Sequence, residues 1–219
     1  MPYDDLEFPE PAADRPYIYI NMVSTIDGKT ILGERNESVV GLGSKEDQAT
    51  MDKLERAADA VLLGAGSIRA NPLSWNPHTK IRIGVTGSGN VPWDCAFFAG
   101  GEAYVLRPRS ASYEVPSHVQ TLEFGEDQID WAQFLIHLHR EMGLQKLHVL
   151  GGSELNAQLL AQDLADELFL TLAPKIKLGR DLPTYAGGDP LPREHVREFE
   201  LLECHPLQNE VFLRYRRRR

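Results

Sequence analysis

The sequence predicts one α/β domain in three layers, α/β/α, with a mostly parallel central sheet and a C-terminal antiparallel hairpin. Runs rich in β-branched and aromatic residues alternate with segments that show helical spacing of apolar residues, as in sheets with crossover helices. The last two strand-like runs follow one another without a helix, which favours an antiparallel edge. The length of 219 residues suits one domain with a substantial core.

The first half of the chain starts with a flexible, acidic, proline-rich arm over residues 1–15, and the single domain spans residues 16–219. The run YIYINMVS at 17–24 predicts a first strand, which a turn at Asp27 and Gly28 ends. Ser44 and the acids after it are typical of a helix start, so a helix is expected from there to about residue 58. Short apolar runs predict strands at 60–63, 81–85, 103–106 and 119–122.

The second half repeats the alternation of helices and strands. Apolar residues recur at helical spacing over 129–142, which predicts an amphipathic helix, and a buried strand follows at 147–150. A helix over 154–164 and a strand over 168–172 come next. Strands at 199–202 and 211–215, joined by a turn over 204–210, predict the closing hairpin.

Composition excludes several classes of function. The net charge of −9 argues against general affinity for nucleic acid, and residues 216–219, a run of four arginines, are expected to form a solvated tail. The two cysteines, Cys95 and Cys204, have no metal or redox spacing, which fits a reducing compartment. The seven histidines do not converge, and no apolar run has the length of a membrane span. We therefore expect a soluble cytoplasmic protein without a metal.

Glycine pairs follow three of the predicted strands, namely Gly64/Gly66, Gly87/Gly89 and Gly151/Gly152. Each pair alone suits a tight turn, and none completes the G-x-G-x-x-G dinucleotide fingerprint. The carboxyl ends of parallel strands meet at one edge of a sheet, where ligands bind. Their joint placement favours an extended ligand with phosphates, such as a dinucleotide, with a phosphate at the helix N-terminus after Gly152.

Several segments resemble the pyrimidine reductases of riboflavin biosynthesis, whose fold is similar to that of dihydrofolate reductase. The similarity extends over nearly the whole chain. It is carried by NMVSTIDGK at 21–29, AADAVLLGAGS at 57–67, RIGVT at 82–86 with VP at 91–92, GGSEL at 151–155, LADEL at 164–168 and APK at 173–175.

The resemblance implies an NADPH-dependent reductase that transfers a hydride to the ribosyl C1′ of an aminopyrimidine ribosyl-phosphate, and a homodimer. Hydride chemistry belongs to the cofactor, so no catalytic side chain is assigned. The implied cofactor residues are Gly64, Gly66, Ser67, Asn71, Thr86, Gly151, Gly152, Ser153 and Glu154. The implied substrate residues are Asn21, Asp27, Ser38, Leu150 and, for its phosphate, Arg56 or Arg69.

Some positions depart from the family pattern. Leu150 stands where the family has an acid, Glu55 where it has an arginine, and Asn71-Pro72 where it has a longer acidic motif. The residues therefore also suit an orphan NADPH reductase of the same fold that acts on a pterin, a folate or another small carbonyl or imine compound. A non-catalytic nucleotide-binding relative is a third interpretation.

Overall fold

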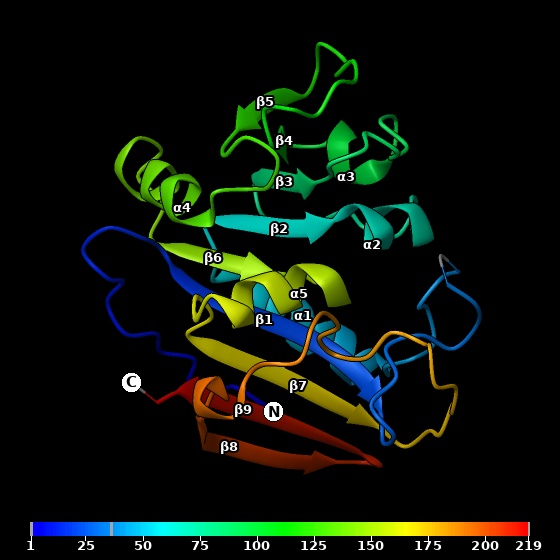
Figure 1. Ribbon diagram of the computed structural model, residues 1–219. Coiled ribbons are helices and arrows are strands. Elements are labelled where there is room, and N and C mark those ends of the chain that lie inside the picture. Colours follow the sequence, from blue (N-terminus) through cyan, green and yellow to red (C-terminus); the bar gives the residue numbers. More distant parts are fainter. Residues whose placement is uncertain (1, 36, 219) are drawn as a thin grey trace.

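The computed structural model describes residues 2–35 and 37–218 of the chain (Figure 1). A single sheet of nine strands has the order β5-β4-β3-β2-β6-β1-β7-β9-β8. β1 to β7 run parallel, and β9 joins β7 in antiparallel register with β8 outside it. The strands are β1 (Tyr17–Thr25), β2 (Ala60–Gly64), β3 (Ile81–Val85), β4 (Glu102–Arg107), β5 (Gln120–Glu123), β6 (Lys146–Val149), β7 (Glu167–Ala173), β8 (Phe199–Leu207) and β9 (Glu210–Arg217).

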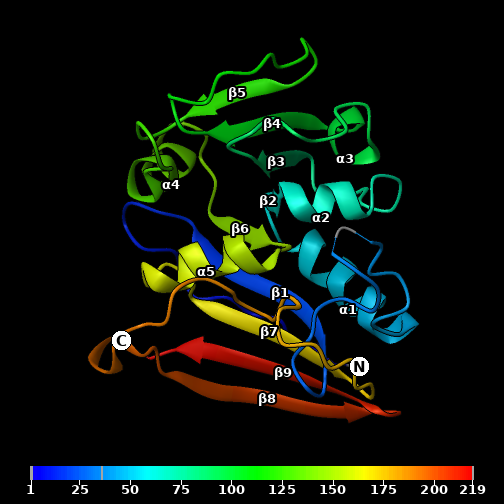
Figure 2. The same ribbon diagram turned by 45° about the vertical axis from the view of Figure 1, so that its right-hand side comes forward.

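Helices cover both faces of the sheet, which confirms the predicted three layers (Figure 2). The helices are α1 (Lys45–Arg56), α2 (Ala65–Ala70), α3 (Ala96–Ala99), α4 (Trp131–Arg140), α5 (Ser153–Ala161) and the 3₁₀ helix η1 (Arg193–His195). α4 and α5 bury Phe134 and Leu159 against Ile18 and Leu62 on one face, and α1 packs Leu54 against Tyr19 on the other. Among the described residues, no helix is long and apolar enough to cross a bilayer.

The predicted strands and the three long helices are confirmed within a few residues, and the Ser44 hydroxyl caps α1 by accepting from the Asp47 N–H at 3.2 Å. The short α2, α3 and η1 were not expected, because they are too brief to show helical periodicity. The predicted turn over 204–210 is too long. Leu207 pairs with Glu210, so only Gln208 and Asn209 form the turn, with Gln208 at φ 53°.

The N-terminal segment packs on the domain instead of forming the flexible arm that its composition predicts. The Tyr3 ring is buried 4.9 Å from that of Phe169, and Phe8 stacks on Tyr19 at 4.5 Å. Arg15 forms a bidentate ion pair with Asp166 at 2.7 Å. These aromatic side chains cover the sheet beside α1, which composition does not reveal. Met1 lies outside the described residues, and the domain bounds of 16–219 stay a prediction.

The C-terminal arginines are not a solvated tail as far as they are described. Arg216 and Arg217 belong to β9, where Arg216 pairs with Glu167 at 2.9 Å and Arg217 pairs with Asp163. Strand pairing with β7 and β8 places these side chains beside carboxylates that are far away in the sequence. Arg219 lies outside the described residues.

His148 on β6 is fully buried and stacks on Tyr19 at 4.8 Å. Neither ring nitrogen has a hydrogen-bond partner among the described residues, and burial lowers the pKa of His148 to about 3. As the pH drops below 6.5, His148 binds a proton in the unfolded chain but stays neutral in the folded chain. The free energy of unfolding therefore falls in this pH range.

We expect His148→Phe, which keeps an aromatic ring but cannot titrate, to remove this acid sensitivity. Between pH 7 and pH 5 the wild type should lose about 2 kcal/mol more stability than the variant. Urea unfolding at both pH values measures the difference, and all other titrating groups cancel in the comparison. An equal loss in both proteins would contradict the buried, neutral state of His148.

Candidate functional site

A cavity of about 870 Å³ runs along the edge of the sheet where the parallel strands end. The ends of β1, β2 and β3 and the start of α5 line it, together with the first half of α1. Of the predicted cofactor residues it brings together Gly64, Gly66, Ser67, Thr86, Gly152, Ser153 and Glu154. Of the predicted substrate residues it brings together Asn21, Arg69 and Leu150.

The two glycines between β6 and α5 have different roles. Gly151 has φ 84°, a left-handed backbone conformation that favours glycine, and a Cβ there would also displace the Met22 sulfur, which would lie 2.5 Å away. Its carbonyl accepts from the Gly64 N–H at 2.8 Å, which fixes the turn on β2. The peptide bond between the glycines is cis. Gly152 has an ordinary φ of −85° and faces the cavity, where a Cβ would lie 3.0 Å from Ser67 Oγ.

The N-terminus of α5 therefore opens into the cavity without side-chain cover. Gly152 is its N-cap residue and no side chain caps the helix. Its first backbone N–H groups lack intrahelical partners, and they carry the positive end of the helix dipole. This arrangement suits an anionic group of a ligand that accepts hydrogen bonds from the N-terminus of α5.

The loop after β3 forms the far end of the cavity. The buried Thr86 hydroxyl accepts from the Gly89 N–H at 3.1 Å, and Tyr113 donates to the Thr86 carbonyl at 2.9 Å. Arg69 on α2 donates to the Asn90 carbonyl of the same loop at 2.7 Å. The structure thus places Arg69 beside the β3 loop, and not at the β1 end of the cavity with Asn21.

Asn71 and Ser38 do not line the cavity, although the family resemblance implies a cofactor role for Asn71 and a substrate role for Ser38. The Asn71 side-chain oxygen accepts from the Ser38 hydroxyl at 2.7 Å and from the Val39 N–H at 3.2 Å. The two residues therefore bind each other and hold the loop before α1, from which Val39 reaches the cavity wall.

Asp27 is likewise occupied by the protein itself and does not line the cavity. Its carboxylate accepts from the Thr25 hydroxyl at 2.6 Å and from the backbone N–H groups of Lys177 and Leu178 at 3.1 and 2.8 Å. The Thr25 hydrogen bond and these backbone bonds lower the pKa of Asp27 to about 2. Asp27 thus ties the loop after β7 to the turn after β1.

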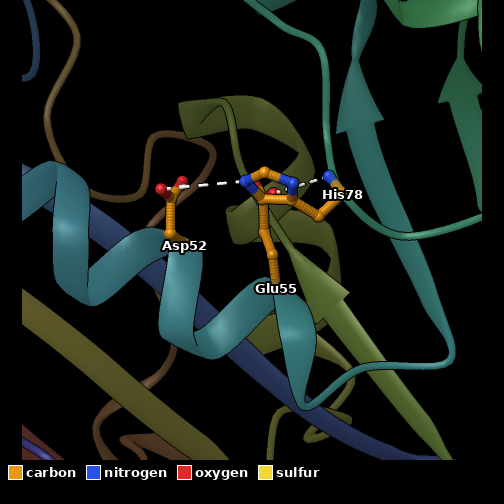
Figure 3. Close-up of side chains that lie close together, drawn as sticks. All are labelled: Asp52, Glu55 and His78. Atoms are coloured by element: carbon orange, nitrogen blue, oxygen red, sulfur yellow. Dashed lines mark hydrogen bonds and ion pairs between the residues drawn. The ribbon is translucent and has the colours of Figure 1, made fainter.

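Arg56 lies at the opposite edge of the sheet, because α1 ends there just before β2 begins. The neighbouring side chains Asp52, Glu55 and His78 lie close together (Figure 3). The backbone N–H of His78 donates to the buried Glu55 carboxylate at 3.1 Å, and burial raises the pKa of Glu55. The Glu55 position therefore lies away from the cavity. Ligand-type atoms of Asp52, Glu55 and His78 lie within 4.8 Å of one another. The Arg56 guanidinium, 3.4 Å from His78 Nε2, opposes a cation there.

Sequence reasoning missed four charged residues of the cavity wall, namely Arg35 and Glu37 in the loop between β1 and α1, Asp47 in the first turn of α1, and Asp127 in the loop between β5 and α4. Arg35 donates to the Asp181 carbonyl at 2.8 Å. In the sequence, Asp47 is typical of the acidic residues in the first turn of a helix. Helical position alone does not tell whether such an acid faces solvent or a cavity.

The fold and the cavity define a doubly wound α/β protein with a cavity along the carboxyl edge of its parallel sheet. Residues 16–213 match the family described as the RibD C-terminal domain. The chain belongs to this family, which confirms the resemblance to riboflavin-pathway reductases.

Several relatives are named 2,5-diamino-6-ribosylamino-4(3H)-pyrimidinone 5′-phosphate reductase. The Archaeoglobus fulgidus protein is 26% identical over 196 residues, which cover 80% of this chain and 88% of that protein. The Methanothermobacter thermautotrophicus protein is 25% identical over 216 residues, which cover 92% and 98% respectively. These relatives support assignment of the chain to the oxidoreductases.

Solved structures share the fold. Acinetobacter baumannii RibD superposes with a TM-score of 0.78 at 20% identity, over 94% of this chain and 59% of that longer chain. The riboflavin biosynthesis reductase Rib7 of Saccharomyces cerevisiae superposes with a TM-score of 0.72 at 16% identity, over 94% and 92%. Both likenesses confirm the fold class.

Proposed function

We propose that the protein is an NADPH-dependent reductase of a ribosylaminopyrimidine phosphate. The observation that carries the proposal is one cavity that runs from the β3 loop, past the open N-terminus of α5, to Asn21 on β1. It offers a phosphate-binding helix end and, beside it, room for a second molecule. The names of the archaeal relatives supply the substrate class.

The residues of the cavity fit a nicotinamide dinucleotide. Gly152, which has no side chain, and the uncapped N-terminus of α5 leave backbone N–H groups open to the pyrophosphate, beside the Ser67 hydroxyl. The loop after Thr86 would hold the adenosine half. When bound, NADPH supplies a hydride from nicotinamide C4, which reduces the ribosyl C1′ and opens the sugar to a ribityl chain. The protein orients the two carbons and excludes water.

The substrate end of the cavity lies at β1 and α1 in this proposal. Asn21 is 8% exposed and donates from its amide nitrogen to the Phe169 carbonyl at 3.5 Å, so its side chain is held at the wall. Leu150 supplies an apolar surface where relatives of the resembled type carry an acid. Arg35 provides positive charge for the phosphate dianion of the substrate.

The test is NADPH consumption, followed by absorbance, with 2,5-diamino-6-ribosylamino-4(3H)-pyrimidinone 5′-phosphate, and identification of the ribityl product by mass spectrometry. Turnover with a pterin or folate instead would establish the orphan-reductase alternative. Tight NADPH binding without turnover of any of these compounds would favour the non-catalytic relative. We further propose a cytoplasmic homodimer, by analogy with the resembled family, which sedimentation of the purified protein tests.

Arg69 is proposed to favour NADPH over NADH by meeting the 2′-phosphate, because it lies beside the β3 loop. We expect Arg69→Ala to weaken NADPH binding at least about tenfold, as loss of a charge-assisted hydrogen bond costs roughly 1.5–3 kcal/mol. NADH binding should change little. Calorimetric titration with both nucleotides measures this, with Arg56→Ala at the opposite edge as the matched control. Equal losses for the two nucleotides would refute the assignment.

A further inference from the structure

Asp47 is a charged group at the substrate end of the cavity to which the proposed reaction assigns no role. It projects from the first turn of α1, on the face of the sheet where Tyr19 of β1 donates to the Leu54 carbonyl of the same helix. Asn21 lies two residues after Tyr19 in β1 and therefore points to the same face. Asp47 and Asn21 both line the cavity, Asp47 from α1 and Asn21 from β1.

Capping does not occupy the Asp47 side chain. An acid at the third position of a helix commonly accepts from the backbone N–H of the N-cap residue. Here the Ser44 N–H donates to Glu210 on β9 at 3.0 Å, and the Ser44 hydroxyl also donates to that carboxylate at 2.5 Å. Glu210 has thus taken the usual partner of Asp47, whose carboxylate lies beside Gly43 and near the Thr171 hydroxyl of β7, at the wall of the cavity.

The surroundings of Asp47 favour a ligand that donates hydrogen bonds to it. Burial raises the pKa of Asp47 to about 6, and the Glu210 carboxylate acts in the same direction. The Thr171 hydroxyl and the Lys175 ammonium act in the opposite direction. At neutral pH the group is therefore ionised in a poorly solvated place, where hydrogen bonds to the charged form gain most.

We propose that Asp47 selects a 2-amino-4(3H)-pyrimidinone ring by accepting hydrogen bonds from its 2-amino group and its N3–H. This inference rests on the proposed function and names the base that the site prefers. The two donors stand side by side on the ring, and a carboxylate offers two acceptor oxygens at a matching separation. Asp47 would then act as a specificity-determining residue rather than a group in the hydride transfer.

A uracil ring does not match the same carboxylate. In the 5-amino-6-(5-phosphoribosylamino)uracil named for a reductase of Thermotoga maritima with the same fold, a carbonyl replaces the 2-amino group. Its oxygen would face a carboxylate oxygen, so one hydrogen bond is replaced by repulsion between two acceptors. A site built around paired donors discriminates strongly against an analogue that lacks one of them.

The experiment compares kcat/KM for the diaminopyrimidinone and the aminouracil ribosyl-phosphates in wild type, Asp47→Asn and Asp52→Asn. Asp52→Asn is the control, because it makes the same charge change on the same helix at a residue that does not line the cavity. We expect wild type to prefer the diamino compound at least about tenfold. Asp47→Asn should lose roughly 10- to 100-fold on that compound and much less on the uracil, with NADPH affinity and melting temperature retained. Asp52→Asn should match wild type.

Equal kcat/KM values of the wild type for the two compounds, or equal losses on both in Asp47→Asn, would overturn the inference. If neither compound is turned over, the proposed function fails, and calorimetry of the two compounds with the NADPH-loaded protein decides the role of Asp47. A binding preference for the diamino compound that Asp47→Asn abolishes upholds the inference. Equal affinities reject it.

Discussion

Gly152→Val is expected to abolish nucleotide binding while it leaves the fold in place. The Cβ of a substituted side chain would lie 3.0 Å from Ser67 Oγ. The two methyl groups of valine would then enter the space proposed for the pyrophosphate. The backbone itself tolerates the change, because φ is −85° at Gly152 and the left-handed value of 84° belongs to Gly151. We expect a loss of at least about 100-fold in NADPH affinity, or about 2.7 kcal/mol.

Calorimetric titration and thermal melting on the same sample separate loss of the site from loss of the fold. Ala161→Val is the matched control, because it adds two methyl groups at an exposed position of the same helix that lies outside the cavity wall. The control should retain NADPH binding. If Gly152→Val melts normally and still binds NADPH with wild-type affinity, the cofactor does not lie at the start of α5.

Glu167→Ala is expected to cost about 3–5 kcal/mol of stability, because it leaves buried positive charge without its partner. Glu167 is fully buried on β7 and accepts from Arg214 at 2.8 Å, from Arg216 at 2.9 Å and from the Tyr17 hydroxyl at 2.9 Å. Arg214 is itself only 4% exposed, so water cannot replace the lost carboxylate. The change therefore weakens the junction between the parallel sheet and the hairpin.

Urea unfolding of the variant measures the cost, and Glu203→Ala is the control. Glu203 also pairs with Arg214, at 2.9 Å, but its side chain is 24% exposed, so its removal should cost distinctly less. Similar losses in the two variants would mean that burial of Glu167 does not control the energy of the network.

The sequence by itself determined the order of the main elements and the edge of the sheet at which the cavity lies. Apolar periodicity is a local property, so the strands and the long helices follow from it within a few residues. The glycine pairs after β2 and β6 mark the cavity edge for a similar reason, because Gly151 has a left-handed φ and a Cβ at Gly64 would lie 3.3 Å from the backbone nitrogen of Gly152.

Tertiary structure decided which polar side chains reach the cavity. Ser38 and Asp27 were predicted at the substrate, but they bind Asn71 and the backbone of Lys177 and Leu178, partners that lie 33 to 151 residues away. Asp47 lines the cavity without capping α1, because Glu210, 166 residues from Ser44, has taken the Ser44 N–H that Asp47 would otherwise bind. Hydrogen bonds over such separations depend on how distant strands and loops pack together. Residue type and local spacing do not predict this packing.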